Sequence, residues 1–419
     1  MNPATIPAII EQHAAEAAFL WVLRRHAVHA PHFRLEDLVK LDNRVEAHLD
    51  GLRVAGEEGW RQCELALESG ESGEVFAAGL LALDNQDPAK LAKLLAIAEA
   101  SEDAAKALVS AFGWVDPSRL VGTVKQLLAS SSSFNQCIGI AACAIHRVNP
   151  GAILEQWVCD VEAPLPLRIR ALRVAGELKR RDLLDPIQDC LHSEPASIRF
   201  WAAWAAVLLG DRGEALDVLK TFLVAGSEFS QRPLPMLLRA MPMASSHAWL
   251  KDLAQSPERQ RDLIAGVGMV GDPLYAPWLI KQMEKPELAR LAGESFSLIT
   301  GADIANEGLD GNQPEGFDSG PTETPQDENV AMDQDENLPW PDAKKMQAWW
   351  IDKKNRFQPG IRHLSGAPIS EAQCLNILRE GFQRQRTAAA LELALMRPDA
   401  HLFEVRAPGW RQHRILHPN

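Results

Sequence analysis

Residues 167–191, LRIRALRVAGELKRRDLLDPIQDCL, and residues 197–223, SIRFWAAWAAVLLGDRGEALDVLKTFL, carry one pattern twice. Each copy has an arginine, an apolar stripe at helical spacing, a polar turn and then a shorter amphipathic helix. At an offset of 31 residues, the equivalent positions are Arg168 and Arg199, Ala175 and Ala206, Leu178 and Leu209, Ile187 and Val218, and Leu191 and Phe222. A two-helix unit of this size cannot bury its apolar face alone, so copies must stack. The sequence therefore predicts an all-α fold built as an α-solenoid.

Similar two-helix patterns precede and follow this pair. Three come before it, beginning near Glu74, Glu102 and Phe134, and others follow it as far as residue 302. The unit that begins at Gln231 is degenerate, because Pro233, Pro235 and Pro242 interrupt its first helix. We expect about eight units of about 30 residues over 71–302. Residues 1–70 predict a helical cap of two helices, at 6–29 and 35–55, on the N-terminal end of the stack.

The arginines on the first helices are assigned a structural role. Arg168, Arg199 and Arg290 recur at similar places in their units, so we expect each to meet a carboxylate or a helix end in the adjacent unit. The second helices are expected to line one face of the curved stack, and such faces bind partners in solenoids.

Residues 303–342 differ in composition from the repeats. They contain twelve Asp or Glu, no Lys or Arg, and few apolar side chains. Such a segment does not bury enough apolar surface to offset the entropy of ordering, so we predict an acidic flexible linker.

Residues 343–419 predict a small helical module that follows the linker. Asp342 is placed to cap a short helix that carries Trp349 and Trp350, and these two side chains are expected to pack the module onto its neighbour. Ser370 and Gln373 form a capping-box pattern for a helix that reaches about Met396. The module has thirteen basic and six acidic residues. Because these charges are spread among apolar helix positions, direct binding of nucleic acid is not expected.

Sequence motifs for catalysis and for cofactor binding are absent. The chain has no P-loop, no dinucleotide-binding GxGxxG, no GxSxG, no HExxH and no His-Glu dipeptide. Its six cysteines form no CxxC pair and are interpreted as buried thiols in a reducing compartment. We therefore predict a protein that is not an enzyme and has no catalytic, cofactor-binding or metal-ligating residues.

The predicted location is the cytoplasm. The N-terminus lacks the basic start and continuous apolar run of a signal peptide, and no apolar stretch approaches 18 residues. No association with a membrane is expected.

Four stretches of the chain resemble one bacterial family of HEAT-like repeat proteins. They are LDNRVEAHLDGLRVAGEEGW at 41–60, the repeat pair at 167–223, LPWPDAKKMQAWWIDKKNRF at 338–357 and RQRTAAALELAL at 384–395. Members of that family are encoded beside type VI secretion genes, whose products include VgrG spike proteins and PAAR-domain effectors such as nuclease toxins. The resemblance implies a protein that binds a cognate effector, with VgrG as a further partner.

Two roles agree with that resemblance. An immunity protein would neutralise the effector by direct binding, and an adaptor or chaperone would load it onto the VgrG–PAAR spike. A third hypothesis, a HEAT-like enzyme or a protein that modifies a cofactor, belongs to another class. Immunity is preferred because nuclease toxins need basic surfaces, which favour an acidic inhibitor, and the net charge of this chain is −13.

Candidate partner-binding residues follow from this electrostatic argument. Asp211 and Glu214 lie in the turn of the second quoted repeat, and Asp335 and Glu336 lie in the acidic linker. We expect these carboxylates to face the basic partner.

Overall fold

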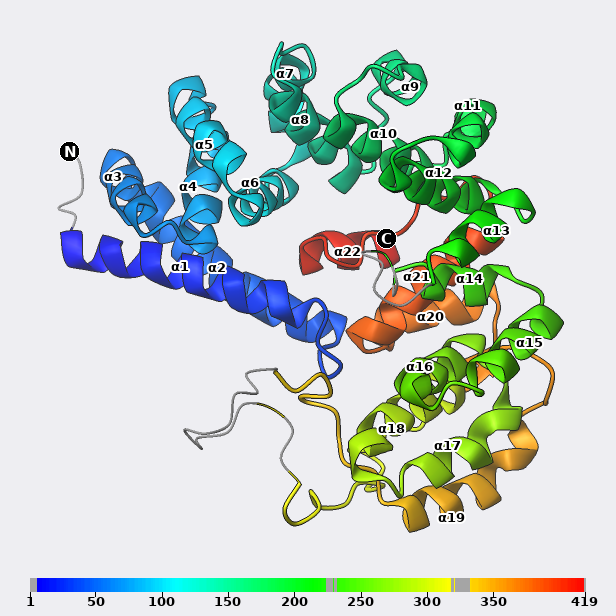
Figure 1. Ribbon diagram of the computed structural model, residues 1–419. Coiled ribbons are helices and arrows are strands. Elements are labelled where there is room, and N and C mark those ends of the chain that lie inside the picture. The colour runs from blue at the N-terminus through cyan, green and yellow to red at the C-terminus, as the bar shows by residue number, and fades with distance from the viewer. Residues whose placement is uncertain (1–5, 224–228, 230–231, 318–319, 321–331, 418–419) are drawn as a thin grey trace. The chain divides into compact units, whose positions relative to one another are not determined.

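The computed structural model in Figure 1 describes the chain except for residues 1–5, 224–228, 230–231, 318–319, 321–331 and 418–419. The described residues form 22 α-helices, six short 3-10 helices and one two-stranded hairpin, which confirms the predicted all-α fold. They divide into two compact units. Unit 1 contains residues 1–29, 33–218 and 398–419, and unit 2 contains residues 30–32 and 219–397.

Unit 1 begins with α1 (Pro7–Ala27), α2 (Leu35–Ala55), α3 (Glu57–Ala66) and the short η1 (Leu67–Ser69). The helices α1 and α2 occupy the places expected for the cap, whereas α3 was not predicted. Leu38, Val45 and Leu49 of α2 are fully buried, because their spacing of three to four residues puts them on the side that packs against α1.

The repeats of unit 1 follow as pairs of helices. Their bounds are α4 (Ser72–Asp84), α5 (Pro88–Ala100), α6 (Glu102–Trp114), α7 (Pro117–Leu128), α8 (Ser133–Ile145), α9 (Ala152–Cys159), α10 (Leu165–Glu177), η2 (Arg181–Leu183), α11 (Leu184–Asp189), η3 (Cys190–His192), α12 (Ala196–Leu209) and α13 (Glu214–Thr221). Asp87 and Asp116 cap α5 and α7 by accepting backbone N–H bonds, and a proline follows each of them at the first helical position.

The first helices of the repeats stand side by side on the inner side of unit 1. These are α4, α6, α8, α10 and α12, and each packs against the next, while α5, α7, α9 and α11 lie on the outer side (Figure 1). Small side chains allow this close approach. A Cβ at Gly176 of α10 would lie 2.8 Å from the Cα of Ala205 on α12, so the two helices need glycine there.

The C-terminal strap, defined as residues 398–416, completes unit 1 and ends in α22 (Gly409–Leu416). It lies on the inner side, across the ends of the first helices (Figure 1). Arg24 of α1 donates to the carbonyls of Arg406 and Ala407 at 3.1 and 2.9 Å, and the buried carboxylate of Asp42 accepts from the backbone N–H of Gly409. The strap therefore satisfies buried charged groups of the N-terminal helices.

Unit 2 contains the remaining repeats and most of the predicted C-terminal module. Its elements are α14 (Leu234–Ala240), α15 (Met243–Leu253), η4 (Pro257–Arg259), α16 (Gln260–Val270), η5 (Pro273–Tyr275), α17 (Ala276–Gln282), α18 (Pro286–Thr300), α19 (Ala343–Lys353), η6 (Lys354–Arg356), β1 (His363–Leu364), β2 (Ala367–Pro368), α20 (Glu371–Glu380) and α21 (Gln383–Met396). Asp342 caps α19 by accepting from the N–H groups of Lys344 and Lys345, as predicted.

The single helix predicted from Ser370 to about Met396 is wrong, because the chain breaks into α20 and α21. Ser370 caps α20, but the side chain of Gln373 donates to the carbonyls of Leu364 and Ser365 and does not complete a capping box. The chain is extended at Gly381, and Gln385 accepts from the N–H of Phe382 at 3.1 Å, which starts α21 as a separate helix.

The structure differs from the predicted flexible linker at both of its ends. Arg290 of α18 binds the carboxylate of Asp333 through two bonds of 2.7 and 2.9 Å, and Asp310 pairs with Pro341 in a β-bridge. Buried arginines thus supply the partners that the acidic segment lacks in its own sequence. The middle of the predicted linker, 318–319 and 321–331, lies outside the described residues.

The predicted C-terminal module, 343–419, is divided between the two units. Residues 343–397 belong to unit 2 and residues 398–419 belong to unit 1. The physical reason for the division is the strap, whose polar contacts are with α1, α2 and the ends of the first repeat helices.

Candidate functional site

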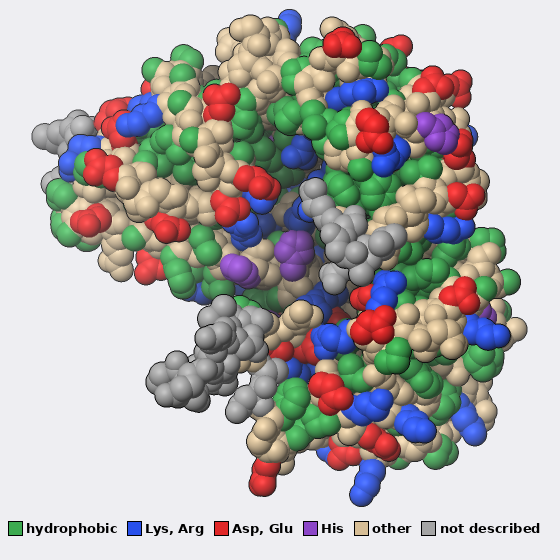
Figure 2. Space-filling view, viewed as in Figure 1, with side chains coloured by type: hydrophobic (Ala, Val, Ile, Leu, Met, Phe, Trp, Pro, Cys, Tyr) green, Lys and Arg blue, Asp and Glu red, His purple; other side chains and the backbone are tan. Residues whose placement is uncertain are grey.

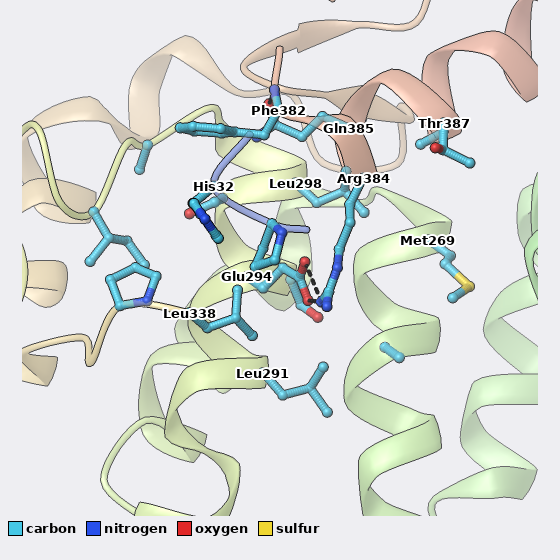
Figure 3. A pocket seen from close by; sticks show the side chains of 18 of the residues that line it. His32, Met269, Leu291, Glu294, Leu298, Leu338, Phe382, Arg384, Gln385 and Thr387 are labelled. Carbon is cyan, nitrogen blue, oxygen red and sulfur yellow. Dashed lines mark hydrogen bonds and ion pairs between the residues drawn. The ribbon is translucent and has the colours of Figure 1, made fainter. Parts of the chain in front are cut away.

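A cavity of about 570 Å³ lies in unit 2, between α16, α18 and α21 (Figure 3). Most of its lining is apolar, and its large apolar side chains are Met269, Leu291, Leu298, Leu338 and Phe382. Residues 302–305 and 337–339, at the two ends of the acidic segment, close one side of it. Its volume is in the range of cavities that hold a small organic molecule or one large side chain.

One ion pair crosses the cavity. Arg384 of α21 donates to both carboxylate oxygens of Glu294 on α18 at 2.9 Å (Figure 3). Burial raises the pKa of Glu294, and the nearby Arg384 guanidinium opposes that shift. The Arg384 side chain is 40% exposed, so it offers its charge to the open side of the cavity.

The wall of the cavity is held by buried charges of the acidic segment. Arg261 donates to Asp335 at 3.0 Å, and Arg290 lies over the Trp340 ring at 4.6 Å in addition to its pair with Asp333. These contacts fix the segment that carries Leu338. Sequence reasoning assigned this segment to a linker and therefore missed the cavity.

A second candidate site lies on the inner side of unit 1, where Lys and Arg side chains gather in a hollow (Figure 2). We define the inner-face arginine cluster as Arg147, Arg170, Arg173 and Arg406. Two carboxylates lie among these four guanidinium groups. Glu177 binds Arg173 at 2.8 Å and Arg147 at 3.2 Å, and Glu404 of the strap binds Arg147 at 3.2 Å and Arg406 at 2.9 Å.

The cluster strongly favours ionised carboxylates. Burial by itself would raise the pKa of Glu404, but Arg406 and Arg147 lower it to about 2. The pKa of Glu177 is also lowered, by Arg173 and Arg147 against the effect of burial. Since four cations meet two anions, the cluster keeps a net charge of +2.

Arg170 is the cation of this cluster that lacks a counterion. It is partly buried and has no hydrogen bond or ion pair with any described residue. Burial lowers the pKa of Arg170, and the like charges of Arg173 and Arg406 lower it further. Its guanidinium is therefore placed to receive an anion.

Aromatic side chains continue the cluster along the inner side. Trp201 and Trp204 of α12 stand 31 residues beyond Arg170 and Arg173, which are the equivalent positions of α10. The guanidinium of Arg173 lies 5.2 Å from the centroid of the Trp201 ring, and the two indole rings pack edge to face at 5.5 Å. The 31-residue register contained the signal for this site, because it aligns Arg170 with Trp201.

A third feature is the N-terminal acidic region, defined as residues 7–103. It contains eighteen Asp and Glu against nine Lys and Arg, a net charge of −9. Glu11, Glu68, Glu71 and Glu99 are exposed, and the described residues give them no ion pair. The region also exposes large apolar side chains: Ile9, Phe19, Leu23, Val54 and Leu65 are 40% to 75% exposed.

Two of the predicted partner-binding residues lie in the loop between α12 and α13. Asp211 accepts hydrogen bonds from Gln188 and from the N–H of Gly213, both at 2.7 Å, so it stabilises the turn. Glu214 is 57% exposed and lies 2.8 Å from His192. Glu214 is therefore accessible, whereas Asp211 is occupied by local bonds.

The other two differ in the same way. The structure corrects the expectation for Asp335, which is 5% exposed and paired with Arg261, because a buried, paired carboxylate is not available to a partner. Glu336 is exposed. The structure does not bring Asp211, Glu214, Asp335 and Glu336 together into one site, since the first two belong to unit 1 and the last two to unit 2.

The residues assigned structural roles have these contacts. Arg168 differs from expectation, because its partner at 3.2 Å is the thiol of Cys190 in its own repeat. Arg199 donates to the Ser193 carbonyl at the end of the preceding unit and pairs with Glu194. Arg290 binds the acidic segment, and its partner is thus Asp333 rather than a neighbouring repeat.

The two tryptophans of α19 pack inside unit 2. Trp349 and Trp350 both meet the Phe296 ring of α18 edge to face, at 5.7 and 6.1 Å. Trp350 also stacks on Phe357. They attach α19 to the last repeat helix of the same unit.

Features of other functional classes were also examined among the described residues. There, no group of three or more His, Cys, Asp or Glu side chains is placed to hold a metal ion, and no helix has the length and apolarity to cross a membrane. All six cysteines are free, and Cys159 is exposed rather than buried as expected. No family model, no curated protein and no solved structure matches this chain.

Proposed function

We propose that this chain is a non-enzymatic protein that binds a type VI secretion effector and neutralises it by direct contact. The observation that carries the proposal is the N-terminal acidic region, with its net charge of −9 and its exposed apolar side chains. Nuclease effectors carry basic surfaces for phosphate, so an acidic region of this kind attracts them and orients their encounter. The secretion context comes from the family resemblance of the four stretches described above.

The arrangement of this region suits tight binding. Its helices α1 to α5 pack on one another, so the surface is formed before the partner arrives and little entropy is lost on association. Exposed Phe19, Val54 and Leu65 are 62%, 75% and 49% exposed and supply apolar area among the charges. Protein interfaces combine such apolar contacts with a polar rim.

The experiment is co-expression with the PAAR-domain nuclease encoded beside this gene. An immunity protein restores growth of the producing cell, and the purified complex lacks nuclease activity. An adaptor instead leaves the effector active in the complex and is required for its export. An enzyme of the third class would be recognised by covalent change of the effector after the two proteins are separated.

Charge reversals locate the contact. We expect Glu68→Lys combined with Glu71→Lys to weaken effector binding by about tenfold or more at low salt, because both side chains are exposed and have no ion pair among the described residues. Glu287→Lys combined with Glu284→Lys makes the same change of charge in unit 2 and is the matched control. Glu214→Lys and Glu336→Lys test the two accessible residues predicted from the sequence. Equal weakening by all of these variants would attribute binding to net charge alone and would overturn the assignment to the N-terminal acidic region.

A further inference from the structure

The inner-face arginine cluster of unit 1 has an unmet requirement for negative charge. Arg147, Arg173 and Arg406 share Glu177 and Glu404, but Arg170 has no partner among the described residues. Partly buried guanidinium groups are normally paired, since loss of hydration is costly without a counterion. A cation held beside two like charges is therefore better explained by a ligand than by the stability of the fold.

The strap shows what kind of ligand the inner side accepts. Residues 398–408 have neither helix nor strand, and their backbone is bound directly: the N–H of Leu402 donates to the Glu177 carbonyl at 2.9 Å, and Arg147 donates to the Leu402 carbonyl at 2.6 Å. The same segment inserts Glu404 between Arg147 and Arg406. Unit 1 thus already holds one irregular segment by its backbone and one glutamate.

The surface next to this segment offers two chemistries in sequence. Arg170 and Arg173 of α10 are followed on α12 by Trp201 and Trp204, and Arg173 lies over the Trp201 ring. A chain that binds here meets guanidinium groups first and indole rings next. Carboxylate and apolar side chains in alternation match that order.

We propose that the inner-face arginine cluster, with Trp201 and Trp204, binds an extended acidic peptide segment of a partner protein, one carboxylate of which pairs with Arg170. The site is distinct from the N-terminal acidic region and has the opposite charge, so it goes beyond the proposed function. A peptide bound here lies beside the strap on the inner side of unit 1.

Charge arguments favour a peptide over nucleic acid. The cluster has a net charge of +2, and Glu177 and Glu404 within it repel phosphate groups. Nucleic-acid sites neutralise several phosphates along the backbone, whereas the chain as a whole has a net charge of −13. One carboxylate at Arg170 satisfies the cluster without that requirement.

The test is fluorescence anisotropy with the full-length chain and a labelled peptide of about ten residues that alternates glutamate with leucine. We expect binding that weakens as salt rises, and a loss of about tenfold or more in affinity for Arg170→Gln. Arg170→Lys is expected to recover part of the loss. Arg181→Gln removes the same charge from an exposed arginine just after α10 and is expected to bind as the unmodified chain does.

A second measurement separates a ligand site from a structural role. Because Arg170 has no partner among the described residues, Arg170→Gln is expected to leave the thermal unfolding temperature unchanged or slightly raised. A clear fall in that temperature, equal affinity of Arg170→Gln and the unmodified chain, or equal binding of a peptide with glutamine in place of glutamate would overturn the proposal. Tighter binding of a single-stranded oligonucleotide than of the acidic peptide would also overturn it, in favour of nucleic acid.

Discussion

At the scale of single residues, unit 1 depends on charges that are buried and paired far from each other in sequence. Arg24 and Asp42 meet Gly409 of the strap, and Arg147 meets both Glu177 and Glu404. Removing one member of such a group leaves an uncompensated charge, which costs more than the pair contributes in net stability. These residues make the fold of unit 1 sensitive to pH.

Glu404 gives the clearest acid dependence. Its pKa is about 2 in the folded chain and near 4.5 when unfolded, so its contribution is present above pH 4.5 and is lost as pH falls through 2. The shift sets an upper limit of about 3 kcal/mol for that contribution. We expect Glu404→Gln to lower the free energy of unfolding at pH 7 and to flatten its pH dependence between about 4.5 and 2. Urea unfolding across this range measures both effects, and an unchanged slope in Glu404→Gln would contradict the assignment.

His146 predicts a second, milder transition. Burial and the nearby charge of Arg411 lower its pKa to about 4, against the effect of its 2.8 Å hydrogen bond with the Phe112 carbonyl. The folded state therefore binds this proton less readily than the unfolded state, and stability falls as pH decreases from 6.5 towards 4. In His146→Gln that part of the pH dependence should disappear. The exposed His26 of α1 provides the control, and His26→Gln should keep the curve of the unmodified chain.

At the scale of elements, the packing of α10 against α12 depends on Gly176. Gly176→Ala places a Cβ 2.8 Å from the Ala205 Cα, a contact that a flexible side chain cannot relieve. We expect a loss of about 1–3 kcal/mol in the free energy of unfolding. Gly122→Ala is the matched control, since Gly122 is exposed on α7 with no atom within 4 Å of its added Cβ. It should gain about 0.5–1 kcal/mol from helix propensity. Chemical unfolding of both variants measures the difference, and a stable Gly176→Ala would show that the helices can move apart without cost.

The repeat helices were predictable because their apolar side chains are periodic. Helices α4 to α12 lie at the places that the 3.6-residue spacing and the Asp-Pro starts indicate. The interruption at Gly381 was missed, since apolar residues continue on both sides of it and mask the start of α21. Local pattern identifies helices well, but it does not show where one helix changes direction.

Residues that depend on distant partners were not predictable in the same way. Asp335 belongs to an acidic, apolar-poor segment, and only the structure places Arg261 and Arg290 beside that segment. The strap likewise has no periodic pattern, and its partner Arg24 is nearly 400 positions away in the chain. In contrast, the Arg170 site could be found from the sequence, because the repeat register itself aligns Arg170 with Trp201.

At the scale of the whole molecule, the division into two units implies that damage to one leaves the other folded. Unit 1 is closed by the strap, and unit 2 is closed by the acidic segment that Arg290 holds. Stability in such a chain is not a single quantity, since each unit has its own contacts. Hydrogen exchange, which reports protection segment by segment, distinguishes the two.

Truncation after Arg397 tests this division. Without the strap, Asp42 loses the Gly409 N–H and Arg24 loses two carbonyl acceptors, so unit 1 should lose about 2 kcal/mol or more while keeping its repeat packing. Amide protection should fall in α2, α6 and α8 and remain unchanged in α16 and α18. Arg290→Met is the reciprocal variant, because it removes the partner of Asp333 in unit 2 and should lower protection there alone. If either change lowered protection equally in both units, the two would unfold as one cooperative body, and stability effects in one could not be assigned to contacts within it.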